Sequence, residues 1–387
     1  MSKKNLVPLL IFILLLLDLF AFTSILPLFP AIIDYYGLTQ RRDQLYDAVE
    51  IFCQFFQNAI GTPSSKRLHS VFFGGILGSL YCLLQFLSSP LLGALSDVYG
   101  RKPILLLSIA GTLLSYVMWV STTSFACFVL SRIVGGLSKA SVSICIAVMA
   151  DVYSQKRIGQ GMAIIGGAFS VGFLVGPMIG VYFSRSAGVD SELAIDVPAK
   201  FAILLTVIEL LFVAIILPET LDISQRKTLV SKVLKNCLLY IKPSALFRFD
   251  AVRDHSGGIR RIPNIKQHAA ATYGISFTIP AYIMIGYSSS VEGFYAGLAL
   301  YAIASGLVVP CMTSCVSNQA TGDVKGVTIG VFRCLGALAR AIGPLFASTV
   351  FWLLGPTVCY ITGGVLLIIP VLMIRHFSPE MVTVKDE

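Results

Sequence analysis

Charged side chains lie inside long apolar stretches of this sequence, where a charge is costly to hold and is usually kept for function. They are two acids and four bases: Asp18, Glu209, Arg132, Lys139, Arg333 and Arg340. Burial at low dielectric favours the neutral form of a carboxylic acid, so the two acids are candidate proton carriers. The four bases are candidate contacts for an anionic substrate, with Gln85 as a neutral polar partner.

The four bases form two pairs with equal spacing. Arg132 and Lys139 are seven residues apart, and so are Arg333 and Arg340, so each pair shares one face of a continuous helix. We therefore predict two basic stripes along one pathway. For Arg132 and Arg333, which lie nearer the ends of their apolar stretches, a side chain that extends to the membrane surface or pairs with another helix is an equally good interpretation.

The composition indicates that membrane-spanning helices position these residues. The chain is 56% hydrophobic and 13% charged, with a mean hydropathy of +0.82, which excludes a soluble globular protein. The net charge of +9 is spread over the connections between apolar stretches. It therefore indicates orientation in a lipid bilayer and no nucleic-acid partner. We expect an all-α, multi-pass membrane protein.

A bilayer needs about 20 apolar residues per helix, and on that measure we predict ten spans. We place them at residues 6–33, 71–95, 103–122, 125–149, 160–183, 199–217, 269–288, 292–316, 327–353 and 357–375. The first is too long and too rich in proline for a cleaved signal peptide. Lys and Arg gather in alternate connections, which places both termini in the cytosol.

The spans divide the chain into three parts. Residues 1–218 form an N-terminal bundle of six helices, residues 219–268 a basic cytosolic loop, and residues 269–387 a C-terminal bundle of about four helices with a cytosolic tail. The connection 34–70 is unusually long. Its apolar stretch 49–56 indicates either a short helix against the outer face or a plain linker.

Residues 93–102 form a short polar turn between the second and third spans, with the sequence Gly-Ala-Leu-Ser-Asp-Val-Tyr-Gly-Arg-Lys. Gly93 and Gly100 let two helices approach and reverse around Asp97. Arg101 and Lys102 mark the cytosolic side. Judged by residue types alone, the stretch is equally compatible with a plain basic hairpin.

Small residues recur along the fifth span, at Gly172, Gly176 and Gly180, with Pro177 beside the second of them. This spacing places them on one helix face, as in ordinary close packing of membrane helices. The Gly-Pro pair recurs 167 residues later, at residues 343–344, as two duplicated halves would leave it. The second half then lacks equivalents of the first two spans.

In combination these motifs resemble the major facilitator superfamily, and its drug:proton antiporters in particular. The turn has the spacing G-x-L-x-D-x-x-G-R-K, the first span joins Asp18 to Pro27-x-x-Pro30, and the sixth ends in Pro-Glu-Thr-Leu at 218–221. The resemblance implies two helix bundles with twelve helices in all, working by alternating access. It also implies export or exchange of organic anions and amphiphilic drugs against protons or a counter-anion.

The same resemblance assigns roles to the two motifs. It implies that the turn gates transport, with Asp97 contacting the start of the eleventh helix near Gly326, and that Gly172 to Gly180 is an antiporter-type motif. The chain departs from the pattern at Val98, where a basic residue is usual, and at Lys139, where small residues are preferred. The absent pair of helices suggests a shortened isoform or an incomplete gene model, and keeps open a non-transporting membrane scaffold or receptor.

No pattern indicates an enzyme, a cofactor or a metal site. The His residues lie in or beside connections, and no G-x-x-x-x-G-K phosphate loop occurs. Cys311 and Cys315 lie one helical turn apart without a nearby His or carboxylate. The expected partners are a small organic anion or drug, protons or a counter-anion, and the lipid bilayer, with the plasma membrane favoured over internal membranes.

Overall fold

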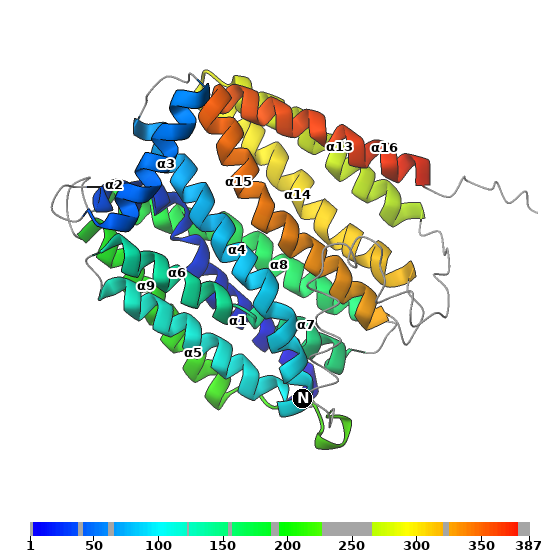
Figure 1. Ribbon diagram of the computed structural model, residues 1–387. Helices are drawn as coiled ribbons and strands as arrows, with labels where there is room; N and C mark the ends of the chain where they lie inside the picture. Colours follow the sequence, from blue (N-terminus) through cyan, green and yellow to red (C-terminus); the bar gives the residue numbers. More distant parts are fainter. Residues whose placement is uncertain are drawn as a thin grey trace, which may run out of the picture. The chain divides into compact units, whose positions relative to one another are not determined.

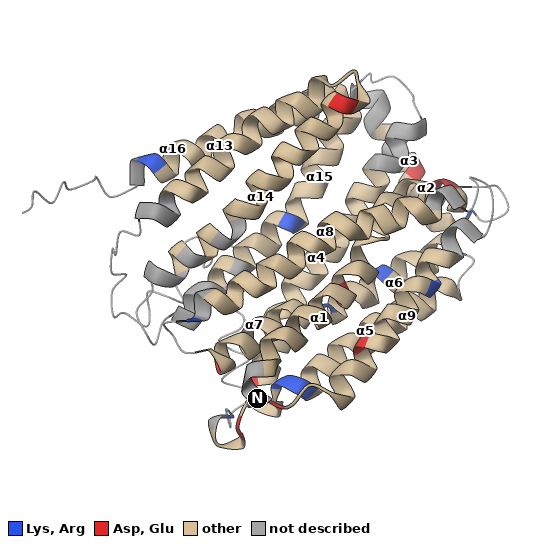
Figure 2. Ribbon diagram, turned by 180° about the vertical axis from the view of Figure 1, so that it is seen from behind, with Lys and Arg blue, Asp and Glu red and all other residues tan. Residues whose placement is uncertain are grey.

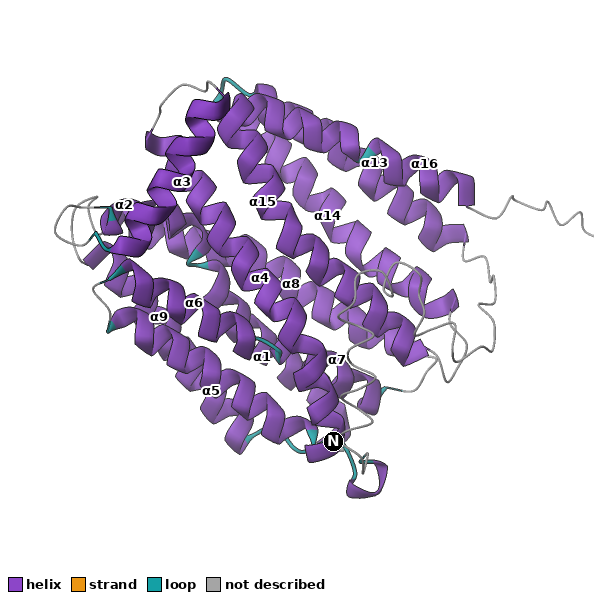
Figure 3. Cartoon of the chain, in the orientation of Figure 1, coloured by secondary structure: helices purple, strands orange, loops and turns teal. Residues whose placement is uncertain are grey.

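The computed structural model describes residues 3–37, 42–60, 66–121, 124–153, 157–186, 193–226, 265–319 and 325–377. Throughout these ranges the regular structure is helical (Figures 1 and 3). In the first part of the chain the helices are α1 (Lys3–Thr23), η1 (Leu26–Leu28), α2 (Phe29–Tyr36), α3 (Gln44–Ile60), α4 (Lys66–Tyr99), α5 (Arg101–Val120), α6 (Phe125–Ser138), α7 (Ser141–Val152), α8 (Ile158–Ser186), α9 (Leu193–Ile215) and η2 (Ile223–Gln225). They are followed by α13 (Ile265–Tyr287), α14 (Val291–Gln319), α15 (Lys325–Leu366) and α16 (Ile368–Phe377).

Most of these helices are apolar enough to cross a bilayer, which confirms the all-α membrane architecture. The described residues contain nine candidate spans, and the last of them, Cys334–Arg375, is 42 residues long. That is about twice what a bilayer needs. Gly355 interrupts its helical backbone with φ of 82° and ψ of 174°, in the gap between the predicted spans 327–353 and 357–375. Dividing the stretch at Gly355 gives the ten predicted spans.

Contacts divide the chain into two compact units. The first contains Met1–Ala251 together with Arg333–Leu353, and the second contains Val252–Phe332 and Leu354–Glu387. In the first unit, α1 packs against α8 and α9, and α5 against α6 and α9. In the second, α13 packs against α14 and α16, and the Tyr282 ring stacks on that of Tyr301 at 5.6 Å between centroids.

Aromatic side chains form the core at one end of the first unit. Trp119, Phe125 and Phe128 are each at most 2% exposed, and the Tyr36 ring stacks on Phe128 with centroids 5.4 Å apart. This packing joins α2, α5 and α6, and fixes the ends of the helices that carry the charged residues.

The long connection after the first span forms helix α3, so the helical interpretation of residues 49–56 is confirmed over the plain linker. The Asp43 carboxylate accepts hydrogen bonds from the backbone N–H of Tyr46 at 2.9 Å and of Ala126 at 2.7 Å. One acid therefore caps the N-terminal ends of both α3 and α6. The Tyr46 ring stacks on Phe73 at 5.6 Å, which holds α3 against α4.

The expected central loop lies mostly outside the described residues. Residues 219–226 of it are described and contain η2, and residues 265–268 already belong to α13.

Candidate functional site

Asp18 on α1 and Lys139 form an ion pair inside the first unit. Lys139 Nζ contacts Asp18 Oδ1, and Ser141 Oγ donates a hydrogen bond of 2.7 Å to Asp18 Oδ2. Asp18 is 3% exposed and Lys139 4% exposed. Both carboxylate oxygens of Asp18 are thus engaged, which is the condition under which a buried charge is tolerated.

Lys139 can reach Asp18 because the fourth span is broken at this residue. Helix α6 ends at Ser138, Lys139 has ψ of 84°, and α7 begins at Ser141. Ser108 on α5 bridges the break: its hydroxyl donates to the Ser138 carbonyl at 2.6 Å and accepts from the Ala140 N–H at 3.1 Å. The span predicted at 125–149 is confirmed, since Phe125–Val152 is one candidate span. Its helix is interrupted at Lys139, however, so the expectation that Arg132 and Lys139 share one face of a continuous helix is wrong.

Glu209 on α9 is the third buried charged residue of this region. It is 1% exposed, and both of its carboxylate oxygens lack a hydrogen-bond partner among the described residues. Its carboxyl interacts electrostatically with Asp18 and with Lys139. We call Asp18, Lys139, Ser141 and Glu209 the buried charge cluster.

Arg132 on α6 lies in an aromatic box. Its guanidinium carbon is 4.9 Å from the Trp119 ring centroid and 5.5 Å from those of Tyr116 and Phe128. Arg132 is only 3% exposed, and its Nη2 has no hydrogen-bond partner within the described part of the chain. The interpretation that this side chain extends to the membrane surface is therefore wrong. Cation–π contacts hold the charge in place and leave one donor unused.

The other predicted anion contacts do not join the cluster. Gln85 is half-buried on α4, and Arg340 is exposed on α15. In the part of the chain that the structure describes, neither side chain hydrogen-bonds to a member of the cluster. The Arg333 side chain lies outside the described residues.

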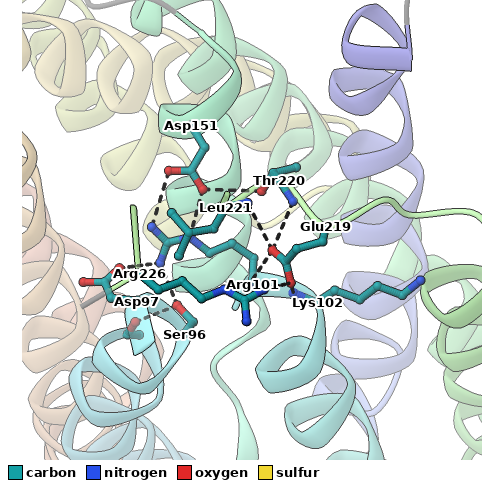
Figure 4. Close-up of polar contacts among 10 residues, drawn as sticks. Ser96, Asp97, Arg101, Lys102, Asp151, Glu219, Thr220, Leu221 and Arg226 are labelled. Atoms are coloured by element: carbon teal, nitrogen blue, oxygen red, sulfur yellow. Dashed lines mark hydrogen bonds and ion pairs between the residues drawn. The ribbon is translucent and has the colours of Figure 1, made fainter. Parts of the chain in front are cut away.

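The polar turn at 93–102 carries a second group of charges around Arg101 (Figure 4). Arg101 Nε donates to Asp151 Oδ2 at 2.9 Å, and Nη1 donates to Asp97 Oδ1 at 2.5 Å and to Ser96 Oγ at 2.8 Å. The Asp151 side chain comes from the last turn of α7. These contacts tie the end of α4 and the start of α5 to the end of the fourth span.

Glu219, just beyond α9, contacts the backbone at the start of α5 (Figure 4). Its Oε1 accepts from the Arg101 N–H at 2.9 Å and its Oε2 from the Lys102 N–H at 3.2 Å. A carboxylate at a helix N-terminus complements the helix dipole. Gly100 has φ of 107°, and a Cβ there would lie 2.5 Å from Glu219 Oε2. We call Ser96, Asp97, Arg101, Asp151 and Glu219 the turn network.

The sequence pointed to only part of this network. The spacing predicts one turn over Gly93, Asp97, Gly100, Arg101 and Lys102, and this is wrong in extent: Gly93 and Asp97 lie in α4, Arg101 and Lys102 in α5, and the helices are separated at Gly100. Asp151 and the capping role of Glu219 were missed, because both partners lie about fifty or more residues away in the sequence. The predicted partner of Asp97 near Gly326 belongs to side chains outside the described residues.

The glycines of the fifth span pack against the first. A Cβ at Gly172 would lie 2.6 Å from Leu19 Cβ, and Thr23 Oγ1 donates to the Gly172 carbonyl at 2.9 Å. A Cβ at Gly176 or Gly180 would collide with residues 23 and 24, while α8 continues through Pro177. The close-packing interpretation accounts for this geometry.

Charged residues are sparse on the helices (Figure 2), and among the described residues no group of three or more His, Cys, Asp or Glu side chains is arranged to hold a metal ion.

Comparison with known proteins shows which family this chain resembles. A model of the Major Facilitator Superfamily matches residues 11–250. Major facilitator superfamily domain-containing protein 10 of Bos taurus is 36% identical, over 97% of this chain and 94% of the relative. The crystal structure of the human organic anion transporter MFSD10 (TETRAN) is 34% identical, with a TM-score of 0.81 over 97% of this chain and 100% of that one. Tetracycline resistance protein, class H, of Pasteurella multocida is 35% identical over 36% of the chain and 34% of its own.

The alignment with the bovine relative also bears on the number of helices. It extends over 440 positions, whereas this chain has 387 residues. At least 53 positions of the alignment therefore have no residue in this chain, which is room for two membrane helices of about 20 residues each.

Proposed function

Because the chain belongs to the Major Facilitator Superfamily of membrane transporters, we propose that it moves organic anions, and amphiphilic drugs with an anionic group, across a membrane by alternating access. The observation that carries this proposal is Arg132, a buried cation that, among the described residues, has an unused donor and no hydrogen bond to a carboxylate. An unsatisfied buried donor is costly unless a ligand fills it. An anionic substrate supplies both the charge and the acceptor.

Proton exchange is the second part of the proposal. Asp18 and Glu209 are the candidate proton carriers, since both are buried on helices that pack against each other. Lys139 is engaged by Asp18, so it contacts a substrate only when that ion pair opens. Gln85, Arg333 and Arg340 remain candidate substrate contacts of the pathway.

The proposed gate consists of Gly93, Asp97, Gly100, Arg101 and Lys102, and the proposed antiporter-type motif of Gly172, Gly176, Pro177 and Gly180. Asp97 at the end of α4 forms an ion pair with Arg101 at the start of α5. We propose that this contact changes as the protein switches. Replacing Asp97 with Asn is expected to slow turnover while leaving membrane insertion intact. Both termini are proposed to face the cytosol, with the plasma membrane as the location.

Proteoliposome uptake tests the central part of the proposal. Purified full-length protein is reconstituted, and entry of radiolabelled p-aminohippurate, an aryl carboxylate, is measured with and without a proton gradient. Arg132→Gln is expected to lower uptake by about ten- to a hundredfold, since one hydrogen bond to a charged group contributes about 1.5–3 kcal/mol. The matched control is Arg157→Gln, at an exposed arginine before α8. Equal uptake by vesicles with and without wild-type protein in both conditions contradicts the proposal.

A non-transporting shortened form is the second candidate, favoured by the alignment positions that have no residue in this chain. Transcripts sequenced across the codons for Gln267 and His268 decide whether a longer form exists. Finding only the 387-residue form removes this candidate's main support.

A further inference from the structure

We propose that Glu209 alone binds and releases the transported proton, and that Asp18 serves as the counter-ion of Lys139 while Glu209 holds that proton. This inference rests on the proposed proton-coupled transport and assigns different roles to the two acids. It follows from how the two buried carboxyl groups are partnered.

Both oxygens of the Asp18 carboxylate have donors. Lys139 supplies a positive charge to one carboxylate oxygen, and Ser141 donates a hydrogen bond to the other. Both contacts stabilise the anion. Protonating Asp18 would leave the Lys139 ammonium buried without its partner, and breaking a buried pair in this way is strongly unfavourable.

Glu209 has the opposite surroundings. It is as buried as Asp18, yet neither carboxylate oxygen has a hydrogen-bond donor among the described residues. Burying an ionised carboxylate without donors is far more costly than burying the neutral acid. The structure therefore corresponds to the state in which Glu209 holds its proton.

Within the described part of the chain, few other ionisable groups act on Glu209 from the helices packed against α9. Asp18 on α1 and Lys139 at the α6–α7 break interact with it electrostatically, and Tyr116 on α5 does so as well. Helix α8 also packs against α9, but its residues 160–181 include no ionisable side chain. Among the groups named here, Lys139 is therefore the cation that can respond when Glu209 loses its proton.

Release of the proton consequently acts on the Asp18–Lys139 pair. The O–H bond of Glu209 breaks, the proton passes to water on one side of the membrane, and the new carboxylate attracts the Lys139 ammonium. Lys139 stands between two helix ends, where its backbone is already non-helical. A shift of Lys139 toward Glu209 weakens the connection between α1 and the fourth span, and so links proton release to movement of helices.

Infrared spectroscopy of the purified protein tests directly whether Glu209 is protonated. As the pH is raised, the wild type is expected to lose the carbonyl stretching band of a buried carboxylic acid. The band is expected to be absent in Glu209→Gln at every pH and retained in the double variant Asp18→Asn with Lys139→Gln, which keeps the pair neutral. The matched control Glu292→Gln, at an exposed acid on α14, is expected to keep it. A band that survives in Glu209→Gln, or is lost in the double variant, overturns the assignment.

Transport separates failure of this inference from failure of the proposed function. In proteoliposomes, Glu209→Gln is expected to exchange p-aminohippurate for p-aminohippurate. Its uptake with an imposed proton gradient is expected to equal its uptake without one. Exchange with an intact gradient response overturns the inference and leaves the proposed function standing. If the wild type does not transport, the proposed function fails, and the infrared band still tests whether Glu209 is the acid that binds a proton.

Discussion

The buried charge cluster and the turn network are built from the same kinds of residue in the same unit, but they differ in how completely they are paired. In the turn network, Asp97, Arg101, Asp151 and Glu219 each make ion pairs or hydrogen bonds. In the cluster and its surroundings, Glu209 and the Arg132 Nη2 atom have no partner among the described residues. A satisfied network holds a conformation, whereas an unsatisfied buried group is available to a ligand or a proton.

The largest effect on stability is expected in the cluster. Lys139→Ala leaves Asp18 buried without its counter-ion, which costs about 3–5 kcal/mol. The yield of folded protein and its thermal unfolding in detergent measure this loss. Adding Asp18→Asn is expected to restore most of it, because the remaining groups are then neutral. If Lys139→Ala alone is as stable as the wild type, the Asp18–Lys139 pair does not hold α1 to the fourth span.

In the turn network, Arg101→Lys is the next largest change. A lysine cannot reach Asp97 and Asp151 together, so at least one of two charge-assisted hydrogen bonds is lost, at about 1.5–3 kcal/mol. Thermal unfolding of the detergent-solubilised protein checks this, with Arg157→Lys at an exposed site as the control. If both variants unfold at the same temperature as the wild type, the network contributes nothing to stability.

Gly100→Ala tests the backbone of the turn without altering a charge. Its φ of 107° is rarely adopted by residues with a Cβ, and the new methyl group would press on Glu219. The expected cost is roughly 1–3 kcal/mol, measured by the same unfolding experiment. Gly78→Ala on α4 is the control, because a Cβ there meets no atom within 4 Å. Equal stability of the two variants argues against strain at Gly100.

The smallest expected effect belongs to Glu219→Gln. The amide keeps one acceptor for the N-terminal N–H groups of α5 but loses the charge that complements the helix dipole, so the cost is about 0.3–1 kcal/mol. A shift in unfolding temperature that disappears at high salt confirms the electrostatic origin. A shift that does not change with salt assigns the effect to hydrogen-bond geometry.

The sequence predicted the features that depend on local pattern. The apolar stretches predicted the spans, including the separation around Gly355. The glycine spacing predicted the reversal at Gly100, although the turn expected over 93–102 is helical on both sides of that residue. Features that depend on distant partners were not predictable. No proline marks the break at Lys139 in the sequence, and Ser108 on another helix stabilises it. The Asp18–Lys139 pair joins residues 121 positions apart.

The same reasoning explains why the sequence left the surroundings of Arg132 open. Its distance along the span suggested that it could reach the membrane surface, whereas the aromatic box around it is assembled mainly from α5. Spacing within one helix indicates which residues share a face, but it does not indicate what a neighbouring helix offers them.

The most direct test compares two glutamates, one from each region. Uptake of p-aminohippurate by proteoliposomes is measured across a series of pH gradients for Glu209→Gln and Glu219→Gln. We expect Glu209→Gln to remove the dependence of uptake on the gradient, and Glu219→Gln to change the rate while keeping that dependence. A gradient dependence that survives in Glu209→Gln, or disappears in Glu219→Gln, would contradict the assignment of proton chemistry to the buried cluster and of conformational holding to the turn network.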